Sequence, residues 1–279
     1  MKKLIICSSL SALFLLMTAF SYNSFPHLKA KTIQQDYAKV NDKLYFGKFE
    51  VSNGDYKTFI NSLKENNQKD LYTKCLPNTS QWKKDGQTEP NADSYYSSNS
   101  FDKYPVVTVE YDAAIEYCKW LTQQYNSDAN RQFHKVLFRL PTEQEWTFAA
   151  NGGDNSKIYT WNTPYMHNQK GEFFCQFLRL GDNAITYDNQ TKTYKVVESN
   201  NIKLNNGLAI PGPINSFNPN QFGLYNMCGN AAEMIFEKGI AKGGSYNDPG
   251  YDVRIASSKA YTDSSPEIGF RVVMEIVIK

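Results

Sequence analysis

The sequence predicts an α+β domain with few short helices and strands and a large irregular fraction. Apolar residues recur at helical spacing in three stretches, near residues 56–63, 114–121 and 146–150. Residues 159–212 are rich in Asn, Asp and Gly, and residues 215–271 combine turn formers with many Tyr and Phe. With 41% hydrophobic and 14% aromatic residues, the chain of 279 residues can bury a sizeable core.

The first 21 residues have the regions of a secretory signal peptide. Lys2 and Lys3 supply the positive charge, and residues 4–20 form an apolar run that ends in small residues. An uncleaved membrane anchor is the alternative, but the run is short for a bilayer span and contains serines. Cys7 lies inside the run and not after it, which argues against lipid modification. We expect an exported protein without a membrane span in the mature chain, located in the periplasm, on the outer-membrane surface or outside the cell.

The segment after the signal peptide leads into the domain. Residues 22–43 are polar and lack periodicity, so we expect a leader segment before a domain that spans residues 44–279. Residues 44–51 predict a first strand, and Asn53 can cap the helix that follows it. The apolar face of that helix consists of Tyr56, Phe59, Ile60 and Leu63.

A long insertion separates this helix from the next. Residues 66–101 hold two prolines and many Asn and Ser, so we expect mostly loop, packed on the domain through its aromatic side chains. Residues 106–109 predict a short strand, and Asp112 is the expected N-cap of a helix that runs to about Gln124. Its apolar face consists of Ala114, Ile115, Cys118 and Leu121.

The third helix has the clearest start signal. Thr142 and Glu145 have the spacing of a capping box, in which each side chain binds a backbone N–H of the other residue. Trp146 and the two alanines after it should then face the core, and Gly152 should end the helix.

Cysteine content and charge restrict the function classes. An exported chain can form disulfides, and the cysteines after the signal region, which allow three pairings, are Cys75, Cys118, Cys175 and Cys228. Cys118 is better explained as a small buried apolar residue, because it lies on the apolar face of a helix. A formal net charge of +2 argues against nucleic acid as the main partner.

Short motifs occur in a characteristic order along the chain. They read FEVSN at 49–53, PVV at 105–107, YCKWL at 117–121, RLPTEQEW at 139–146, FNPNQFGLYNMCGNAAE at 217–233, GGSY at 243–246 and IGFR at 268–271. Together they resemble the formylglycine-generating enzyme (sulfatase-modifying factor) family. The resemblance implies an α+β fold similar to C-type lectins, whose long connections are held by packing and bound cations.

The oxidase chemistry of that family depends on copper held by two cysteine thiolates after the GGS motif. At the corresponding places this chain has Asp248 and, near the second, Asp252 and Val253, and no cysteine follows Cys228. Carboxylate oxygen is a hard ligand and does not suit Cu(I), so we expect no copper site. Ser245, which matches the serine lining the family's oxygen pocket, is retained.

The resemblance also implies calcium sites. Asn226, Gly229, Ala231 and Glu233 match one family site without a gap, and backbone carbonyls plus one carboxylate suit a structural Ca²⁺. A packed turn without metal is the alternative, although Glu233 would then need another partner. A second, weaker site is matched by Asn183, Ala184, Asn206 and Leu208, where Asn206 replaces the carboxylate.

Other chemistries have little support in the sequence. A related branch of the fold binds iron through three histidines, but His27, His134 and His167 lack ligand spacing. Residues with hydrogen-bonding side chains gather instead beyond the GGS motif, which predicts a recognition loop. They are Tyr246, Asn247, Asp248, Tyr251 and Asp252.

Two functions follow from these patterns. The first is an exported family member without oxidase activity that acts as a binding or structural module of the bacterial cell envelope, with an envelope protein or an extracellular ligand as partner. The alternative is an oxidase that converts a sulfatase cysteine to formylglycine with altered metal ligands.

Overall fold

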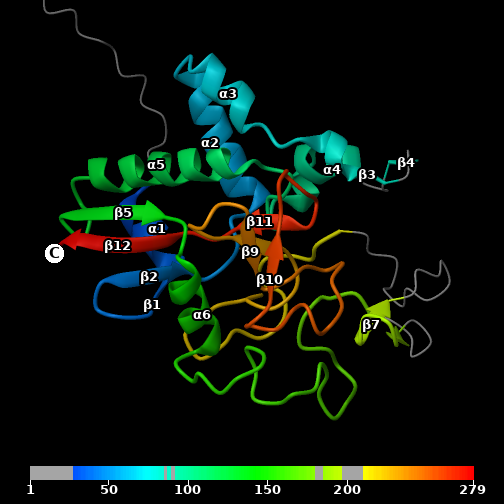
Figure 1. The fold of residues 1–279 in the computed structure, drawn as a ribbon. Helices are drawn as coiled ribbons and strands as arrows, with labels where there is room; N and C mark the ends of the chain where they lie inside the picture. Colours follow the sequence, from blue (N-terminus) through cyan, green and yellow to red (C-terminus); the bar gives the residue numbers. More distant parts are fainter. Residues whose placement is uncertain (1–27, 85–86, 89–91, 180–184, 197–209) are drawn as a thin grey trace, which may run out of the picture.

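The fold is that of a computed structural model, which describes residues 28–84, 87–88, 92–179, 185–196 and 210–279. Its first sheet has the strand order β1-β2-β12-β5 and is antiparallel throughout. The strands are β1 (Tyr37–Lys39), β2 (Leu44–Gly47), β12 (Val273–Ile278) and β5 (Lys135–Arg139). The last strand, β12, lies between β2 and β5 and pairs with both, so it joins an early and a middle segment of the chain in one sheet (Figure 1).

A second sheet carries the motif-rich C-terminal part, in the order β10-β9-β8-β11. Its strands are β8 (Ala232–Met234), β9 (Ile240–Lys242), β10 (Ser258–Ala260) and β11 (Ile268–Phe270). The β8–β11 pair is parallel, which sets Glu233 opposite Gly269. Two small hairpins complete the strands, β3 (Lys83–Lys84) with β4 (Gln87–Thr88) and β6 (Ile185–Asp188) with β7 (Thr193–Val196).

The helices are α1 (Ala30–Gln35), α2 (Asn53–Glu65), α3 (Lys69–Cys75), α4 (Ala92–Ser97), α5 (Tyr111–Ser127) and α6 (Glu143–Asn151), with 3₁₀ turns at Thr79–Trp82 and Asn99–Phe101. The helix α5 packs on the first sheet, and α1, α2 and α3 pack against α5. The longest helix, α5, runs along β5 and β12, and α6 lies beyond the other side of these strands (Figure 1). Within the described residues no helix is both long and apolar enough to cross a membrane.

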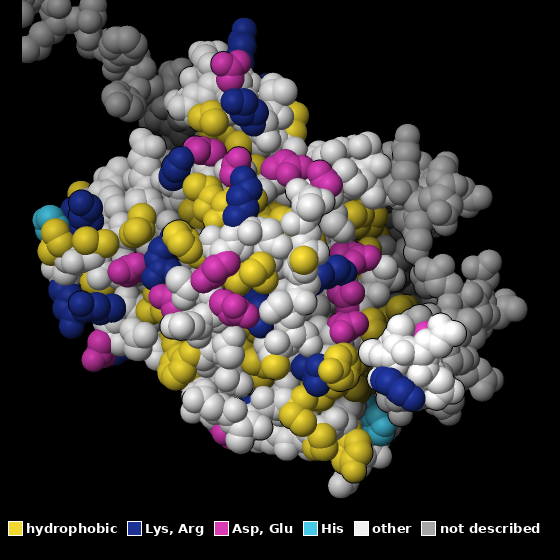
Figure 2. Space-filling view, in the orientation of Figure 1, with side chains coloured by type: hydrophobic (Ala, Val, Ile, Leu, Met, Phe, Trp, Pro, Cys, Tyr) yellow, Lys and Arg dark blue, Asp and Glu magenta, His cyan; other side chains and the backbone are white. Residues whose placement is uncertain are grey.

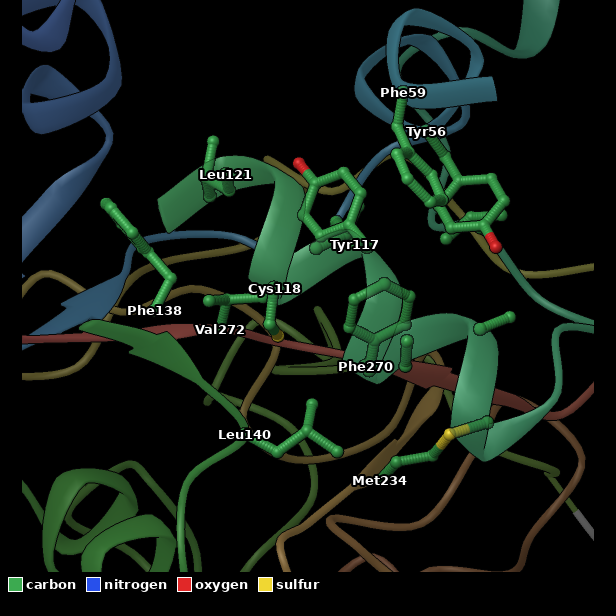
Figure 3. Close-up of a cluster of buried hydrophobic side chains, with 14 of the residues drawn as sticks. Tyr56, Phe59, Tyr117, Cys118, Leu121, Phe138, Leu140, Met234, Phe270 and Val272 are labelled. Atoms are coloured by element: carbon green, nitrogen blue, oxygen red, sulfur yellow. The ribbon is translucent and has the colours of Figure 1, made fainter. Parts of the chain in front are cut away.

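The main core lies between α2, α5 and the two sheets (Figure 3). Tyr56 stacks on Tyr117 with ring centroids 5.8 Å apart, and Phe270 of β11 meets both rings edge-on. These contacts bury large apolar surfaces and join the helices to the second sheet. A second cluster under α6 is centred on Trp146, which is fully buried.

The predicted helix faces are confirmed, but two caps differ. The apolar residues predicted for α2 are buried, as are those of α5 apart from the half-buried Ile115. Ser52, not Asn53, caps α2 through its hydroxyl, because the Asn53 amide is buried and donates to the carbonyls of Tyr95 and Phe101. The helix α5 begins at Tyr111, so Asp112 lies in its first turn and not at its cap.

The predictions for the N-terminal segment and the insertion need correction. Residues 30–39 form α1 and β1 and bury Ala30 and Ile33 in the main core, so they belong to the domain and not to a leader. The insertion at 66–101 contains α3 and α4, although Trp82 and Tyr95 are buried as its aromatic content suggests. Both helices are too short to show periodicity in the sequence.

Two predicted strands are shortened or lost. The first strand ends at Gly47, and no ladder forms over residues 106–109, although their apolar side chains are buried. Val106 donates to the Val51 carbonyl, whereas Thr108 donates to Ser265 and has a positive φ of 59°. That φ turns the chain out of the extended conformation at Thr108. Residues 106–109 therefore bond to two different segments and do not pair with one strand.

The capping box of α6 is confirmed and gives a stability prediction. The Glu145 N–H donates to Thr142 Oγ1 at 3.3 Å, and Glu145 Oε2 accepts from the Thr142 N–H at 2.9 Å. Thr142→Ala should lower the free energy of unfolding by about 1 kcal/mol, measured by urea titration. Thr58→Ala, within a helix and away from its start, is the control and should change it by less; equal losses would contradict a capping role.

Candidate functional site

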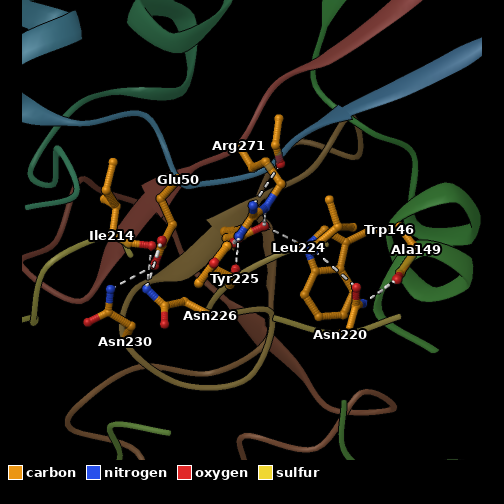
Figure 4. Close-up of polar contacts among 12 residues, drawn as sticks. Glu50, Trp146, Ala149, Ile214, Asn220, Leu224, Tyr225, Asn226, Asn230 and Arg271 are labelled. Atoms are coloured by element: carbon orange, nitrogen blue, oxygen red, sulfur yellow. Dashed lines mark hydrogen bonds and ion pairs between the residues drawn. The ribbon is translucent and has the colours of Figure 1, made fainter. Parts of the chain in front are cut away.

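A buried ion pair between Arg271 and Glu233 lies at the centre of the candidate site. Arg271 is fully buried, and its Nη2 lies 2.6 Å from Glu233 Oε1 (Figure 4). Its remaining N–H groups donate to Glu233 Oε2 and to the carbonyls of Gly47 and Tyr225. Trp146 Nε1 donates to the same Glu233 carboxylate at 2.7 Å. The end of β11, β8, the β2 exit and α6 therefore meet at this ion pair.

A second buried carboxyl group, that of Glu50, lies beside this pair. Its two oxygens accept from the side-chain amides of Asn226 and Asn230 at 3.1 and 2.8 Å. Burial raises the pKa of Glu50 from 4.5 to about 8, although Arg271 and the two amides act in the opposite direction. Glu50 comes from the FEVSN motif and the two asparagines from the long C-terminal motif, so two family motifs meet here.

The raised pKa of Glu50 predicts a pH dependence of stability. Between about pH 4.5 and 8 the unfolded chain has released this proton and the folded chain retains it, so the free energy of unfolding should fall as the pH rises. Urea titrations at about pH 5 and about pH 8 measure this change. Glu50→Gln should reduce the difference between the two pH values; an unchanged difference would contradict a protonated Glu50.

The predicted calcium ligands lie close together, but the charged one has another partner. Glu233 uses both oxygens for Arg271 and Trp146, so its charge is already balanced and it does not require a metal ion as partner. Asn226 Oδ1 is buried and unpartnered, which leaves a neutral oxygen available. A neutral oxygen set without a free carboxylate fits Ca²⁺ poorly. Calcium at Asn226, Gly229, Ala231 and Glu233 stays a prediction, tested by elemental analysis and by melting with and without EDTA. The weaker site, Asn183, Ala184, Asn206 and Leu208, lies outside the described residues.

Asp248, which the motif resemblance matches to the family's first copper ligand, takes part in an ion network. Asp248 Oδ2 accepts from the Ser245 hydroxyl at 2.6 Å and from the Ser245 N–H at 2.8 Å. Lys259 Nζ lies 2.9 Å from Asp248 Oδ1 and also contacts Glu267, which in turn accepts from Asn247. The donor set is carboxylate and ammonium instead of thiolate, so these residues do not fit a copper ion.

The same network argues against nucleophilic chemistry at Ser245. Its side chain is fully buried, and its hydroxyl donates to Asp248. Burial alone would lower the pKa of Lys259, but Asp248 and Glu267 raise it above its ordinary value. Lys259 therefore stays protonated and cannot act as the base that a serine nucleophile requires.

The predicted recognition loop is only partly at the surface. Tyr246 is 6% exposed, so it is not a contact side chain for a partner, and Asn247 and Asp248 are engaged in the network. Tyr251 is 68% exposed, and the Arg254 guanidinium lies 3.3 Å from its ring centroid. Asp252 is also exposed. The outward-facing part of the loop therefore begins beyond Asp248.

Sequence reasoning missed a neighbouring aromatic surface, here named the aromatic face: Trp161, Tyr165, Phe173 and Tyr251. Tyr165 is 68% exposed, and its carbonyl accepts from Trp161 Nε1 at 2.8 Å. Met166 packs against Gly250 beside Tyr251. In Figure 2, hydrophobic side chains gather at the lower right of the face shown. The density of aromatic residues over 159–177 was the available signal in the sequence.

The four described cysteines form no disulfide in this structure, and no metal-ligand cluster is found among the described residues. Cys75, Cys118, Cys175 and Cys228 are buried free thiols, and burial raises the pKa of each. Within the described part of the chain, no group of three or more His, Cys, Asp or Glu side chains is placed to hold a metal ion.

The fold is of the formylglycine-generating enzyme class, which confirms the predicted fold class. PvdO from Pseudomonas aeruginosa has this fold, with a TM-score of 0.51 and 18% identity over 83% of this chain and 80% of that one. Treponema denticola variable protein 1 has a TM-score of 0.51 and 15% identity over 86% and 91%. At these identities the likeness concerns the fold alone.

Residues 29–276 match the sulfatase-modifying factor enzyme 1-like domain, and the chain belongs to this family. It is 27% identical over 162 residues to inactive C-alpha-formylglycine-generating enzyme 2 of Mus musculus. The matched residues cover 58% of this chain and 39% of that protein. It is 26% identical over 194 residues to formylglycine-generating enzyme of Bos taurus, which covers 60% and 43%. The matched part is thus less than half the length of either relative.

Proposed function

We propose that the protein is an exported family member without formylglycine-generating activity, acting as a binding or structural module of the bacterial cell envelope. The observation that carries this proposal is Asp248, which stands at the first thiolate position and is ion-paired with Lys259. One relative of similar identity bears the name of an inactive enzyme, which agrees with loss of activity within this family.

The physical reason lies in ligand softness and charge. Cu(I) prefers thiolate sulfur, and Asp248 offers hard carboxylate oxygens whose charge the Lys259 ammonium already balances. Near the second position, Asp252 is solvent-exposed and Val253 has no ligand atom. Neither place supplies a ligand that holds copper for oxygen activation.

Incubation with copper and a cysteine-containing sulfatase peptide tests this part of the proposal. We expect no loss of peptide thiol and no mass change to the aldehyde, whereas the Bos taurus enzyme under the same conditions should give both. Aldehyde formation that requires this protein would overturn the proposal. It would favour the alternative, an oxidase that uses other metal ligands.

The binding role is assigned to the aromatic face. Tyr165 and Tyr251 are the most exposed of its side chains, and Tyr251 is held by Arg254 both through its ring and through its carbonyl, which accepts from Arg254 Nε at 2.7 Å. Rigid aromatic side chains offer contact area at low entropic cost. The proposed partner is an envelope protein or an extracellular ligand.

Capture from the envelope fraction of the native host tests this role. Tyr251→Ala and Tyr165→Ala should leave the melting temperature unchanged and reduce capture of the same partner. Phe236→Ala is the matched control, because Phe236 is 57% exposed and is outside the aromatic face. If all three variants retain every partner equally, the aromatic face is not the binding surface.

A further inference from the structure

A cavity of about 370 Å³ is lined by other elements than those that carry the Asp248 network and the aromatic face. Its walls come from α1, the β2 exit, α2 and α5, and from the chain near Ile214. The side chains used below are Asp36, Asp55, Tyr37, Phe49, Tyr117 and Leu121. Its volume suits a small organic molecule.

Two carboxylates, those of Asp36 and Asp55, line this cavity, and neither forms an ion pair with a basic side chain among the described residues. Burial, and next the Asp55 charge, raise the pKa of Asp36, and no side-chain hydrogen bond is made by its carboxylate among the described residues. Asp55 accepts from the Ser52 hydroxyl, which is a neutral partner. Lys48 attracts Asp36, but its ammonium donates to the Gln35 carbonyl. The two negative charges repel each other, so a cation bound between them would be stabilised.

The other charged side chains on the cavity wall do not neutralise the carboxylates of Asp36 and Asp55. Lys103 is exposed and has no ion pair among the described residues. Glu50 lies on the buried side of the cavity and is held by the amides of Asn226 and Asn230. A cationic ligand would therefore be drawn to Asp36 and Asp55.

The Tyr117 hydroxyl on the cavity wall is a second, independent observation that points to a ligand. Tyr117 is 5% exposed, yet its hydroxyl has no hydrogen-bond partner in the described structure. The hydroxyl points away from Phe270, toward the side of Leu121, and both Tyr117 and Leu121 line the cavity (Figure 3). The hydroxyl oxygen is not fully enclosed by protein, so it is open to the cavity and can form a hydrogen bond to a molecule there.

The rest of the wall suits an apolar body. Tyr37 and Phe49 contribute aromatic rings, and Leu121 and Val272 contribute aliphatic surface. Aromatic faces next to carboxylates attract organic cations, and the carboxylates can replace the water that an ammonium group loses on entering such a site. We propose that this cavity binds a small organic ammonium ion, with the charged group between Asp36 and Asp55 and the apolar part against Tyr37, Tyr117 and Leu121.

Calorimetric titration with phenethylamine tests the proposal on the full chain as purified. We expect saturable binding of one equivalent. The matched probe 3-phenylpropanoate has the same ring and the opposite charge, and we expect no binding. Absence of phenethylamine binding, including absence because another part of the chain fills the cavity, would overturn the proposal, as would equal binding of both probes.

Three variants locate the site. Asp36→Asn removes one carboxylate without removing a hydrogen bond, and should weaken phenethylamine binding about tenfold. Tyr117→Phe should weaken it about fivefold. Asp42→Asn changes an exposed Asp outside the cavity and should have no effect. Unchanged melting temperatures confirm folding, and equal affinity of Asp36→Asn and Asp42→Asn would place binding elsewhere.

Discussion

Arg271→Met should lower the free energy of unfolding by about 3–5 kcal/mol, the largest loss expected from any single charge in this protein. The substitution leaves Glu233, 1% exposed, without its cation, and leaves the carbonyls of Gly47 and Tyr225 without their donor. Water cannot replace these contacts in a fully buried site, so the desolvation of the carboxylate is no longer offset.

Urea unfolding measures this loss, with Arg254→Met as the control. Arg254 lies over the exposed ring of Tyr251 and should cost less than about 1 kcal/mol. In the double variant Arg271→Met with Glu233→Gln, no uncompensated charge remains, so part of the loss should be recovered. Additive losses in that cycle would show that the two residues do not act as a pair.

Gly229→Ala should cost about 3–5 kcal/mol, because it combines backbone strain with a collision. Gly229 has a φ of +75°, and an added Cβ would lie 2.1 Å from the Gln176 carbonyl oxygen. That oxygen accepts from the Asn230 N–H at 2.8 Å, so moving it also breaks a hydrogen bond next to Glu50.

Gly223→Ala separates the two causes. Gly223 has a φ of +79°, but an added Cβ would have no atom within 4 Å. It should cost about 1–2 kcal/mol from the backbone conformation alone. If both glycine variants lose the same stability, the close approach of Gln176 to Gly229 does not contribute.

Local signals explain which elements were predictable. The helices α2, α5 and α6 are long enough to show an apolar face, and the α6 capping box is a contact within four residues. The helix α3 has seven residues and α1 has six, too few for such a pattern. Their positions depend on packing against α5, which the sequence does not show.

Long-range partners explain what was missed in the candidate site. The family motifs correctly indicated that Asn226, Glu233 and Arg271 belong to one structural region, but motif matching does not say which side chain neutralises which. The motif match places Glu233 at a calcium site but does not reveal that Arg271, 38 positions later, is its ion-pair partner. The same limit applies to Tyr246, whose burial depends on how the loop folds back on the domain.

Asp248, which matches the family's first copper thiolate, is engaged here by Lys259 and Ser245 and should hold no copper. Titration with Cu(I) in competition with a chelator, followed by counting the copper retained per chain, tests this claim most directly. We predict that the protein retains no more Cu(I) than its Asp248→Ala variant does. Retention of one equivalent by the unaltered chain, lost in Asp248→Ala, would contradict the claim.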